Sequence, residues 1–307
     1  MARIYDLVMT HKLDADDFFI HRVQQHCAER GLNFFLIEPL WIEAFRIYYE
    51  LGEVSARVLL NMHSEHHEPD EAYHRLVRLA HERGTRVIDS PDAALAAFDK
   101  GRLHPRLVEV GLPVPYSVVV EQAAAGTFRL ADAQRTALGN PFVIKPCLGY
   151  GRKGVLLDAT SEKDMLRSVA AWPNSHYLLQ RRVVPRPLGA DPAYFRVYYV
   201  FGTTWCCWWN CYTDRYRVVS VAEMEKFQLA RLTELVRRIA ELTRMNFFSS
   251  EIAQTEEGDY VLIDYVNDQC HLVTQSADPR IGVPDVVVAG IALRLVEGAQ
   301  ELIARAR

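Results

Sequence analysis

The residues best suited to chemistry in this sequence surround a glycine-rich loop. Gly149, Tyr150, Gly151 and Gly154 form a G-x-G-x-x-G pattern, and Lys145 lies shortly before it. The flanking segments "FVIK" and "VLLD" predict a strand on either side of the loop. Glycine-rich backbone can turn its N–H groups toward phosphate oxygens, and a lysine adds a compact positive charge. The loop is therefore a candidate flexible lid over phosphates.

The order of these elements excludes two common nucleotide-binding classes. A Rossmann fingerprint needs the glycine loop to run from the first strand into a helix, whose N-terminus meets the pyrophosphate. Here the loop lies mid-chain and a strand follows it. In protein kinases the glycine loop precedes the strand lysine, whereas Lys145 comes before this loop, and no H-R-D or D-F-G follows.

A second candidate group is a pair of carboxylates in a hairpin. The segment "SSEIAQTEEGDYVLIDYVNDQ" predicts two strands joined by a tight turn at Glu257-Gly258. Such a hairpin brings Glu251 and Asp264 side by side. Two neighbouring carboxylates repel each other unless a cation lies between them, so the pair is a candidate cation site.

The elements that must position these groups fall into three expected domains. Alternating strands and helices in the first third predict an α/β domain with a parallel sheet. The proline-stiffened connection "GLPVPYSVVV" marks a boundary near Leu112. We expect an α/β domain over 1–112, a small lobe carrying the glycine-rich lid over 113–184, and a C-terminal lobe with the cation site over 185–307. In the last lobe we expect a hairpin about Gly202-Thr203 and a single helix over Ala222–Arg244.

Several segments, taken in order, resemble the ATP-grasp superfamily. "AFDKGRLH" with "LVEVGLPVPYSVVV" resembles the segment in which a D-K pair opens a helix before a G-[LI]-P-V-P strand. The lysine strand, glycine lid, helix and strand follow in the family's order, and "YFRVYYVFG" resembles its D-x-R-V-x-V-x-G strand. The resemblance covers Phe98 to Asp268. Within the superfamily, the sequence is similar to the ribosomal-protein glutamate ligase and glutathione synthetase-like carboxylate–amine ligases. It implies an ATP-grasp fold preceded by a Rossmann-like pre-ATP-grasp domain.

The resemblance also implies how ATP is held. Lys100 and Lys145 are then the two phosphate lysines, and the glycines of the lid cover the phosphates. "HYLLQRRVV" resembles the hinge that reads adenine, in which Gln180 bonds the adenine amino group and Arg182 and Val183 present backbone groups to the ring. An acid usually holds the ribose a few residues further on, where this sequence reads "PRPLGAD", and Asp191 is its only candidate there.

For the metal, the resemblance implies Mg²⁺, or Mn²⁺ in its place, on Glu251, Asp264 and Asn267. Magnesium takes hard oxygen ligands and keeps substrate phosphates and water in its shell. The family spaces acid and asparagine as E-x-N, whereas Asp264 and Asn267 are three apart. Asn267 faces the metal only if the strand ends or bulges at Tyr265–Val266, and Asp268 is the alternative ligand.

The implied reaction begins with attack of a substrate carboxylate on the γ-phosphate. An amine then displaces phosphate from the acylphosphate, and the substrates are small molecules or peptides. Lys145 and Arg196 are the implied catalytic cations, although Tyr194 stands where the family usually has an acid. Two alternatives stay open: an ATP-grasp kinase acting on a small-molecule hydroxyl, and a nucleotide-binding module with degraded catalysis. Dimers are frequent among similar enzymes, so a homodimer is also expected.

Composition excludes several other function classes. The net charge of −4 over 307 residues argues against a nucleic-acid partner, which favours a positive field. No 18-residue apolar run predicts a membrane span, and the first residues turn polar too soon for a secretion signal. The six cysteines form no C-x-x-C pair, which is typical of reduced thiols in a cytoplasmic protein. The histidines of "HSEHHEPDEAYH" are expected in a solvated loop rather than a metal site.

Overall fold

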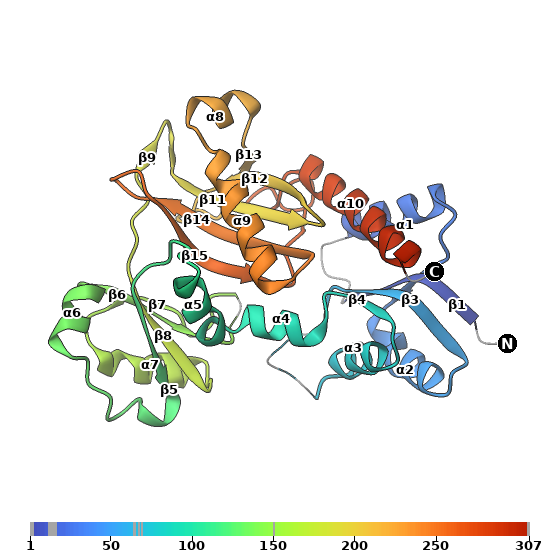
Figure 1. The fold of residues 1–307 in the computed structure, drawn as a ribbon, viewed down its shortest axis with the longest axis horizontal. Coiled ribbons are helices and arrows are strands. Elements are labelled where there is room, and N and C mark those ends of the chain that lie inside the picture. The colour runs from blue at the N-terminus through green and yellow to red at the C-terminus, as the bar shows by residue number, and fades with distance from the viewer. Residues whose placement is uncertain are drawn as a thin grey trace. The chain divides into compact units, whose positions relative to one another are not determined.

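The computed structural model describes residues 3–11, 17–63, 66, 68, 70–149 and 151–305. The chain forms two compact units (Figure 1). The first unit comprises Met1–Leu95, Tyr194–Ser250 and Val266–Arg307, and the second comprises Ala96–Ala193 and Glu251–Tyr265. The expected domains over 1–112, 113–184 and 185–307 follow other boundaries than these two units, and they stay a prediction.

The first unit contains a parallel sheet with the strand order β2–β1–β3–β4. All three neighbouring pairs are parallel, as the alternation of strands and helices predicts. The strands are β1 (Arg3–Thr10), β2 (Phe34–Ile37), β3 (Val54–Asn61) and β4 (Arg86–Ile88). The helices in this part of the chain are α1 (Asp17–Glu29), the short 3₁₀ helix η1 (Pro39–Trp41), α2 (Ile42–Glu50) and α3 (Ala72–Glu82).

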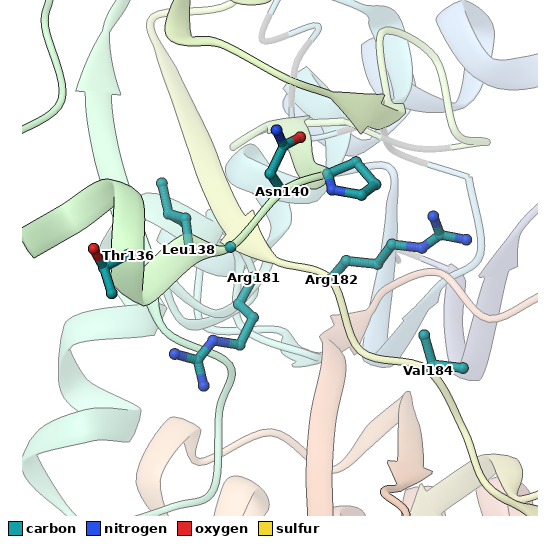
Figure 2. A pocket seen from close by; sticks show the side chains of 8 residues that line it. Thr136, Leu138, Asn140, Arg181, Arg182 and Val184 are labelled. Carbon is teal, nitrogen blue, oxygen red and sulfur yellow. The ribbon is translucent and has the colours of Figure 1, made fainter. Parts of the chain in front are cut away.

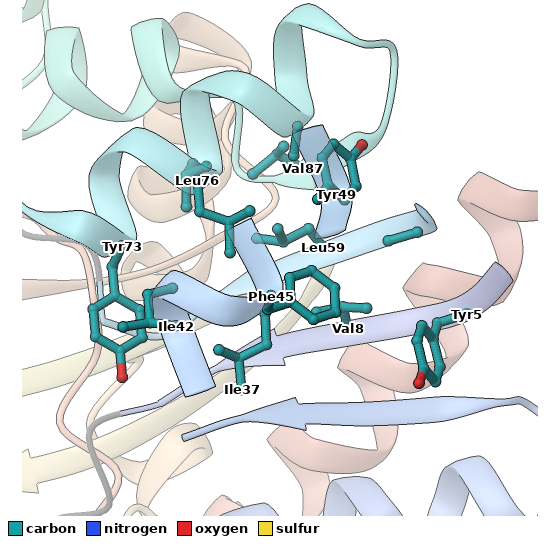
Figure 3. Packing of buried hydrophobic residues seen from close by; sticks show 13 residues of the cluster. Tyr5, Val8, Ile37, Ile42, Phe45, Tyr49, Leu59, Tyr73, Leu76 and Val87 are labelled. Atoms are coloured by element: carbon teal, nitrogen blue, oxygen red, sulfur yellow. The ribbon is translucent and has the colours of Figure 1, made fainter. Parts of the chain in front are cut away.

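Two helices cover one face of this sheet with apolar side chains (Figure 3). In α3 the buried residues Tyr73, Leu76, Val77 and Ala80 recur at helical spacing, so they form one stripe. Phe45 of α2 packs in the same cluster. Burying a side chain of this size stabilises the fold by roughly 1.5–3 kcal/mol, so this core fixes the helices to the sheet.

A second sheet has the strand order β13–β12–β11–β14–β15. Its strands are β11 (Tyr194–Val200), β12 (Thr203–Trp209), β13 (Tyr216–Val218), β14 (Phe247–Gln254) and β15 (Tyr260–Asn267), and β9 (Pro187–Leu188) pairs separately with β10 (Asp191–Pro192). The predicted hairpin at Gly202-Thr203 is confirmed: β11 and β12 are antiparallel, and Phe201 and Gly202 take positive φ values of 44° and 88° in the turn. The turn between β14 and β15 also lies at the predicted place, since the Gly258 N–H donates to the Thr255 carbonyl at 2.9 Å.

The predicted single helix over Ala222–Arg244 is wrong. The structure has α8 (Val221–Lys226) and α9 (Ala230–Thr243) in its place. Gln228 lies between them with φ 54°, a left-handed conformation that no α-helix can contain. The closing helix α10 (Asp285–Arg305) packs against α1.

The second unit has an antiparallel sheet with the strand order β5–β8–β6–β7. Its strands are β5 (Ser117–Glu121), β6 (Phe142–Pro146), β7 (Leu156–Ala159) and β8 (His176–Arg181). The remaining helices are α4 (Pro91–Phe98), α5 (Lys100–Glu109), α6 (Asp132–Leu138) and α7 (Met165–Ala171), with 3₁₀ turns η2 (Gln122–Ala124) and η3 (Glu162–Asp164). Ile144, Met165, Tyr177 and Leu179 form the centre of its core. No helix within the described ranges is long and apolar enough to cross a membrane.

Candidate functional site

The start of α5 holds Lys100 in a fixed place. The Asp99 side chain caps the helix and accepts hydrogen bonds from the backbone N–H groups of Gly101 at 2.9 Å and Arg102 at 3.3 Å. The Lys100 N–H donates to the carbonyl of Cys147, just beyond β6, at 3.0 Å. A Cβ on Gly101 would lie 3.1 Å from the Cys147 sulfur. The Asp-Lys-Gly sequence therefore docks the helix start against the end of the lysine strand.

Lys100 and Lys145 lie with the predicted carboxylates inside the second unit. Lys100 Nζ lies 3.2 Å from Asp264 Oδ1, and Lys145 Nζ donates to the carbonyl of Ile263 at 3.0 Å. Burial lowers the pKa of Lys145, and the Lys100 charge lowers it further, while Asp264 and Glu251 act in the opposite direction. The structure thus brings four of the predicted site residues into one electrostatic group.

The glycine-rich loop connects β6 and β7, which are antiparallel. At its base the Leu148 carbonyl accepts hydrogen bonds from Trp172 Nε1 at 3.1 Å and Asn174 Nδ2 at 2.6 Å. Gly154 has φ 70°, and a Cβ there would lie 2.6 Å from Trp172 Cβ. Gly151 has φ 58°, but a Cβ there would meet no atom within 4 Å.

The two glycines therefore differ in what they do. Gly154 allows close packing at the base of the loop, whereas Gly151 gives backbone freedom at an open position. Gly149 lies nearer the base, where a Cβ would approach Pro146 at 3.4 Å. The predicted lid residue Tyr150 lies outside the described residues.

The predicted hinge residues lie at the end of β8 and just beyond it. Gln180 is 2% exposed, and its Nε2 donates to Tyr265 Oη at 3.1 Å. Arg182 is exposed and Val183 is half-buried. Arg182 also lines an open cavity of about 520 Å³ in the second unit (Figure 2). The other residues that line this cavity are Thr136, Leu138, Gly139, Asn140, Pro141, Arg181 and Val184.

Two further predicted residues, Arg196 and Asn267, belong to the first unit and meet at Ser249. Arg196 Nη1 donates to Ser249 Oγ at 3.2 Å, and Asn267 Nδ2 donates to the Ser249 carbonyl at 3.3 Å. The Arg196 guanidinium lies 5.1 Å from the centre of the Trp209 ring, a contact that helps to orient it.

The alternative metal ligand Asp268 also belongs to the first unit and is paired with a histidine. Its Oδ2 lies 2.9 Å from His66 Nε2. His63 Nε2 lies similarly, 3.0 Å from Glu71 Oε1. Two histidines of the "HSEHHEPDEAYH" segment thus contact carboxylates. The expected solvated loop is wrong for His63, His66 and His74, which are 5%, 7% and 2% exposed, while His67 of that segment lies outside the described residues.

The donor set in the second unit suits magnesium better than a transition metal. In the parts of the chain that the structure describes, no three His, Cys, Asp or Glu side chains are grouped as metal ligands. Glu251 and Asp264 supply only carboxylate oxygens, so phosphate oxygens, water or an amide oxygen must complete a shell. Magnesium is the ion that ordinarily accepts such an arrangement.

Sequence reasoning missed His104 and Tyr265. His104 Nδ1 lies 2.7 Å from Tyr265 Oη, and the two rings stack with centroids 5.8 Å apart. Burial lowers the pKa of His104 to about 4, so the imidazole is neutral near pH 7. One signal was present in the sequence: His104 is four residues after Lys100, which places both on one face of α5. Tyr265 is adjacent to Asp264, but nothing in the local pattern indicates its partner.

Solved structures of ATP-grasp ligases match nearly the whole chain. The ATP-grasp ligase PsnB complexed with a minimal precursor, Mg and ADP is 16% identical with a TM-score of 0.62, over 98% of this chain and 99% of PsnB. D-alanine–D-alanine ligase from Bacillus anthracis is 15% identical with a TM-score of 0.65, over 100% and 98% of the two chains. The chain has the ATP-grasp fold.

A third ATP-grasp structure agrees with this assignment. The RimK domain protein from Sphaerobacter thermophilus DSM 20745 is 19% identical, with a TM-score of 0.63 over 96% of this chain and 98% of its own. No family model matches the sequence, and no curated protein matches it either. The expected mixed α/β class and the ATP-grasp fold are therefore confirmed, while the Rossmann-like character of the first domain stays a prediction.

Proposed function

We propose that this chain is an ATP- and Mg²⁺-dependent ligase that activates a substrate carboxylate as an acylphosphate for attack by an amine. The observation that supports this most strongly is the grouping of Lys100, Lys145, Glu251 and Asp264 in the second unit. Two cations suit the phosphates of ATP, and two carboxylates suit the magnesium ion that accompanies them.

The ion pair between Lys100 and Asp264 is compatible with this role. While each charge faces the other, neither is left uncompensated in the ligand-free protein. With nucleotide and metal bound, Lys100 would hold a phosphate and Asp264 would hold the cation. The open position at Gly151 would permit a close approach of the loop backbone to the phosphates.

The remaining residues would act on the substrate carboxylate and the metal shell. Arg196 supplies a positive charge for the transferred phosphoryl group or the substrate carboxylate, and its contacts with Ser249 and Trp209 limit its orientations. When bound, Mg²⁺ would neutralise part of the negative charge of the phosphates. Asn267 stays the predicted third ligand, with Asp268 as the alternative.

The structural neighbours support a peptide or an amino acid as substrate. PsnB has been solved with the precursor peptide PsnA2 and AMPPNP, and the Bacillus anthracis ligase has been solved with ATP. We therefore propose small-molecule or peptide carboxylates and amines as the two substrates.

One assay separates the proposal from its alternatives. The protein is incubated with ATP, Mg²⁺ and pools of amino acids, peptides and hydroxylated metabolites, and ADP, free phosphate and product masses are measured. A ligase releases ADP and phosphate in equal amounts, with a product equal to two substrates less one water. ADP with a phosphorylated product and no free phosphate would indicate a kinase. Nucleotide binding without ADP would indicate a binding module, and either result overturns the proposal.

A further inference from the structure

A chain of three hydrogen-bonded side chains lies inside the second unit. His104 of α5 and Gln180 of β8 both contact the hydroxyl of Tyr265 in β15, at 2.7 and 3.1 Å. The three residues are only 6%, 2% and 1% exposed, respectively. Buried polar groups destabilise a fold unless they are matched with partners. The proposed reaction uses neither His104 nor Tyr265, so their arrangement needs another explanation.

The hydrogens in this chain can be assigned from the partners. The Tyr265 hydroxyl has one hydrogen and two acceptor positions. Ser117 also contacts this hydroxyl, but its own hydrogen goes to the Pro115 carbonyl at 2.9 Å. His104 is neutral near pH 7, and we take the tautomer that carries its hydrogen on Nε2, in which Nδ1 accepts. At 2.7 Å from Nδ1, the Tyr265 hydrogen then points to His104, and a lone pair of Tyr265 faces Gln180.

This assignment fixes the carboxamide of Gln180. Because a lone pair of Tyr265 faces Gln180, the NH₂ group of Gln180 turns toward Tyr265, and the structure has it in this orientation. Gln180 then offers only Oε1 to another partner. A carboxamide without such a clamp can rotate by half a turn, because its two ends have nearly the same shape. It would then offer either an acceptor or a donor.

We propose that His104 and Tyr265 hold the Gln180 carboxamide in one orientation, and that this orientation selects adenine over a 6-oxopurine. The inference rests on the proposed function, in which Gln180 bonds the nucleobase. The 6-amino group of adenine donates to Oε1. The 6-oxo group of guanine or hypoxanthine instead places an acceptor opposite an acceptor. His104 and Tyr265 are thus positioning residues for base selection.

The test is the ratio of two dissociation constants, for ITP and for ATP with Mg²⁺, measured by calorimetry. ITP replaces the 6-amino group of ATP with an oxo group. The wild-type protein should bind ATP at least about tenfold more tightly than ITP, because a buried acceptor left without a donor is strongly unfavourable. In Tyr265→Phe, and in His104→Leu as an independent second variant, Gln180 can rotate, so the ratio should fall by about tenfold.

Ser117→Ala is the matched control, because it removes a neighbour of Tyr265 and leaves both His104 and Gln180 in place. It should keep the wild-type ratio. If both positioning variants weaken ATP and ITP by the same factor, the chain only supports packing and the inference is overturned. A wild-type protein that binds both nucleotides equally overturns it too, while leaving the proposed function intact. A wild-type protein that binds neither nucleotide overturns the proposed function and this inference together.

Discussion

Replacing Asp264 with asparagine separates a metal ligand from a structural ion pair. At 3.2 Å from Lys100, the Coulomb attraction at an effective dielectric constant of about 20 is roughly 5 kcal/mol. Much of this is offset, since forming the pair also removes both groups from water. The asparagine retains a carbonyl oxygen that can accept from Lys100. We therefore expect Asp264→Asn to lose about 1–2 kcal/mol of unfolding free energy, which lowers Tm by roughly 2–8 °C.

The response to ligand carries the functional part of this prediction. A ligand at about 100 times its Kd stabilises the wild-type protein by about 2.7 kcal/mol. If losing one carboxylate weakens the Mg²⁺·AMPPNP complex about 100-fold, the same concentration stabilises the variant by only about 0.4 kcal/mol. Thermal melts of both proteins, with and without the complex, measure the two effects separately.

The matched control is Glu256→Gln, which removes an exposed carboxylate from the turn of the same hairpin. It should melt like the wild type and respond fully to Mg²⁺·AMPPNP. If Asp264→Asn is destabilised but gains as much from the complex as the wild type, Asp264 is only a structural partner of Lys100. The magnesium assignment would then be refuted.

Three further predictions concern single residues. Lys145→Ala should reduce ADP formation at least about 100-fold with an unchanged circular dichroism spectrum, because it removes a phosphate cation; a folded variant with wild-type kinetics would contradict the assignment. Gly151→Val should raise the KM for ATP, since valine tolerates neither the positive φ nor a phosphate close to the backbone, whereas Gly154→Ala should chiefly lower Tm, because its Cβ meets Trp172. Equal effects of the two glycine substitutions on KM and Tm would argue against the lid. Because of His104, the free energy of unfolding of the wild-type protein should fall by up to roughly 3 kcal/mol as the pH falls from about 6.5 to about 4. Burial lowers the pKa of His104 to about 4, so over this range the unfolded chain binds a proton there more readily than the folded protein. When the stability measured by melts is plotted against pH, His104→Leu should show a smaller slope than the wild type. Equal slopes would disprove that the folded protein lowers the pKa of His104.

The parts of the site that could be predicted are those encoded by local order along the chain. Lys145, the glycine-rich loop and the following strand are consecutive, so their sequence alone indicates a strand–loop–strand hairpin. The turn at Gly258 and the hairpin at Gly202 could be predicted for the same reason. The broken helix could not, because the left-handed residue is Gln228 and no glycine or proline marks the break.

Contacts between distant segments were beyond sequence reasoning. The pairing of Lys100 with Asp264 depends on how α5 docks onto Cys147 and on where β15 lies. No periodic pattern in the sequence indicates the docking of α5 or the position of β15. Tyr265 shows the same limit: its position beside Asp264 was visible, but its bonds to His104 and Gln180 depend on two other elements. Local patterns therefore predicted the charged groups, and the fold alone determined how their hydrogens and charges are matched.

The second unit is built from two separate stretches of chain, Ala96–Ala193 and Glu251–Tyr265. During synthesis, the ribosome produces Lys100 and Lys145 long before it produces the hairpin that carries Glu251 and Asp264. Until that hairpin emerges, the lysines lack their carboxylates and Gln180 lacks Tyr265. Non-local contacts of this kind slow folding, and here they also delay it until most of the chain has been made. A nascent chain therefore completes the nucleotide-binding unit we propose only once Tyr265 has been made, while the first unit still lacks Val266–Arg307.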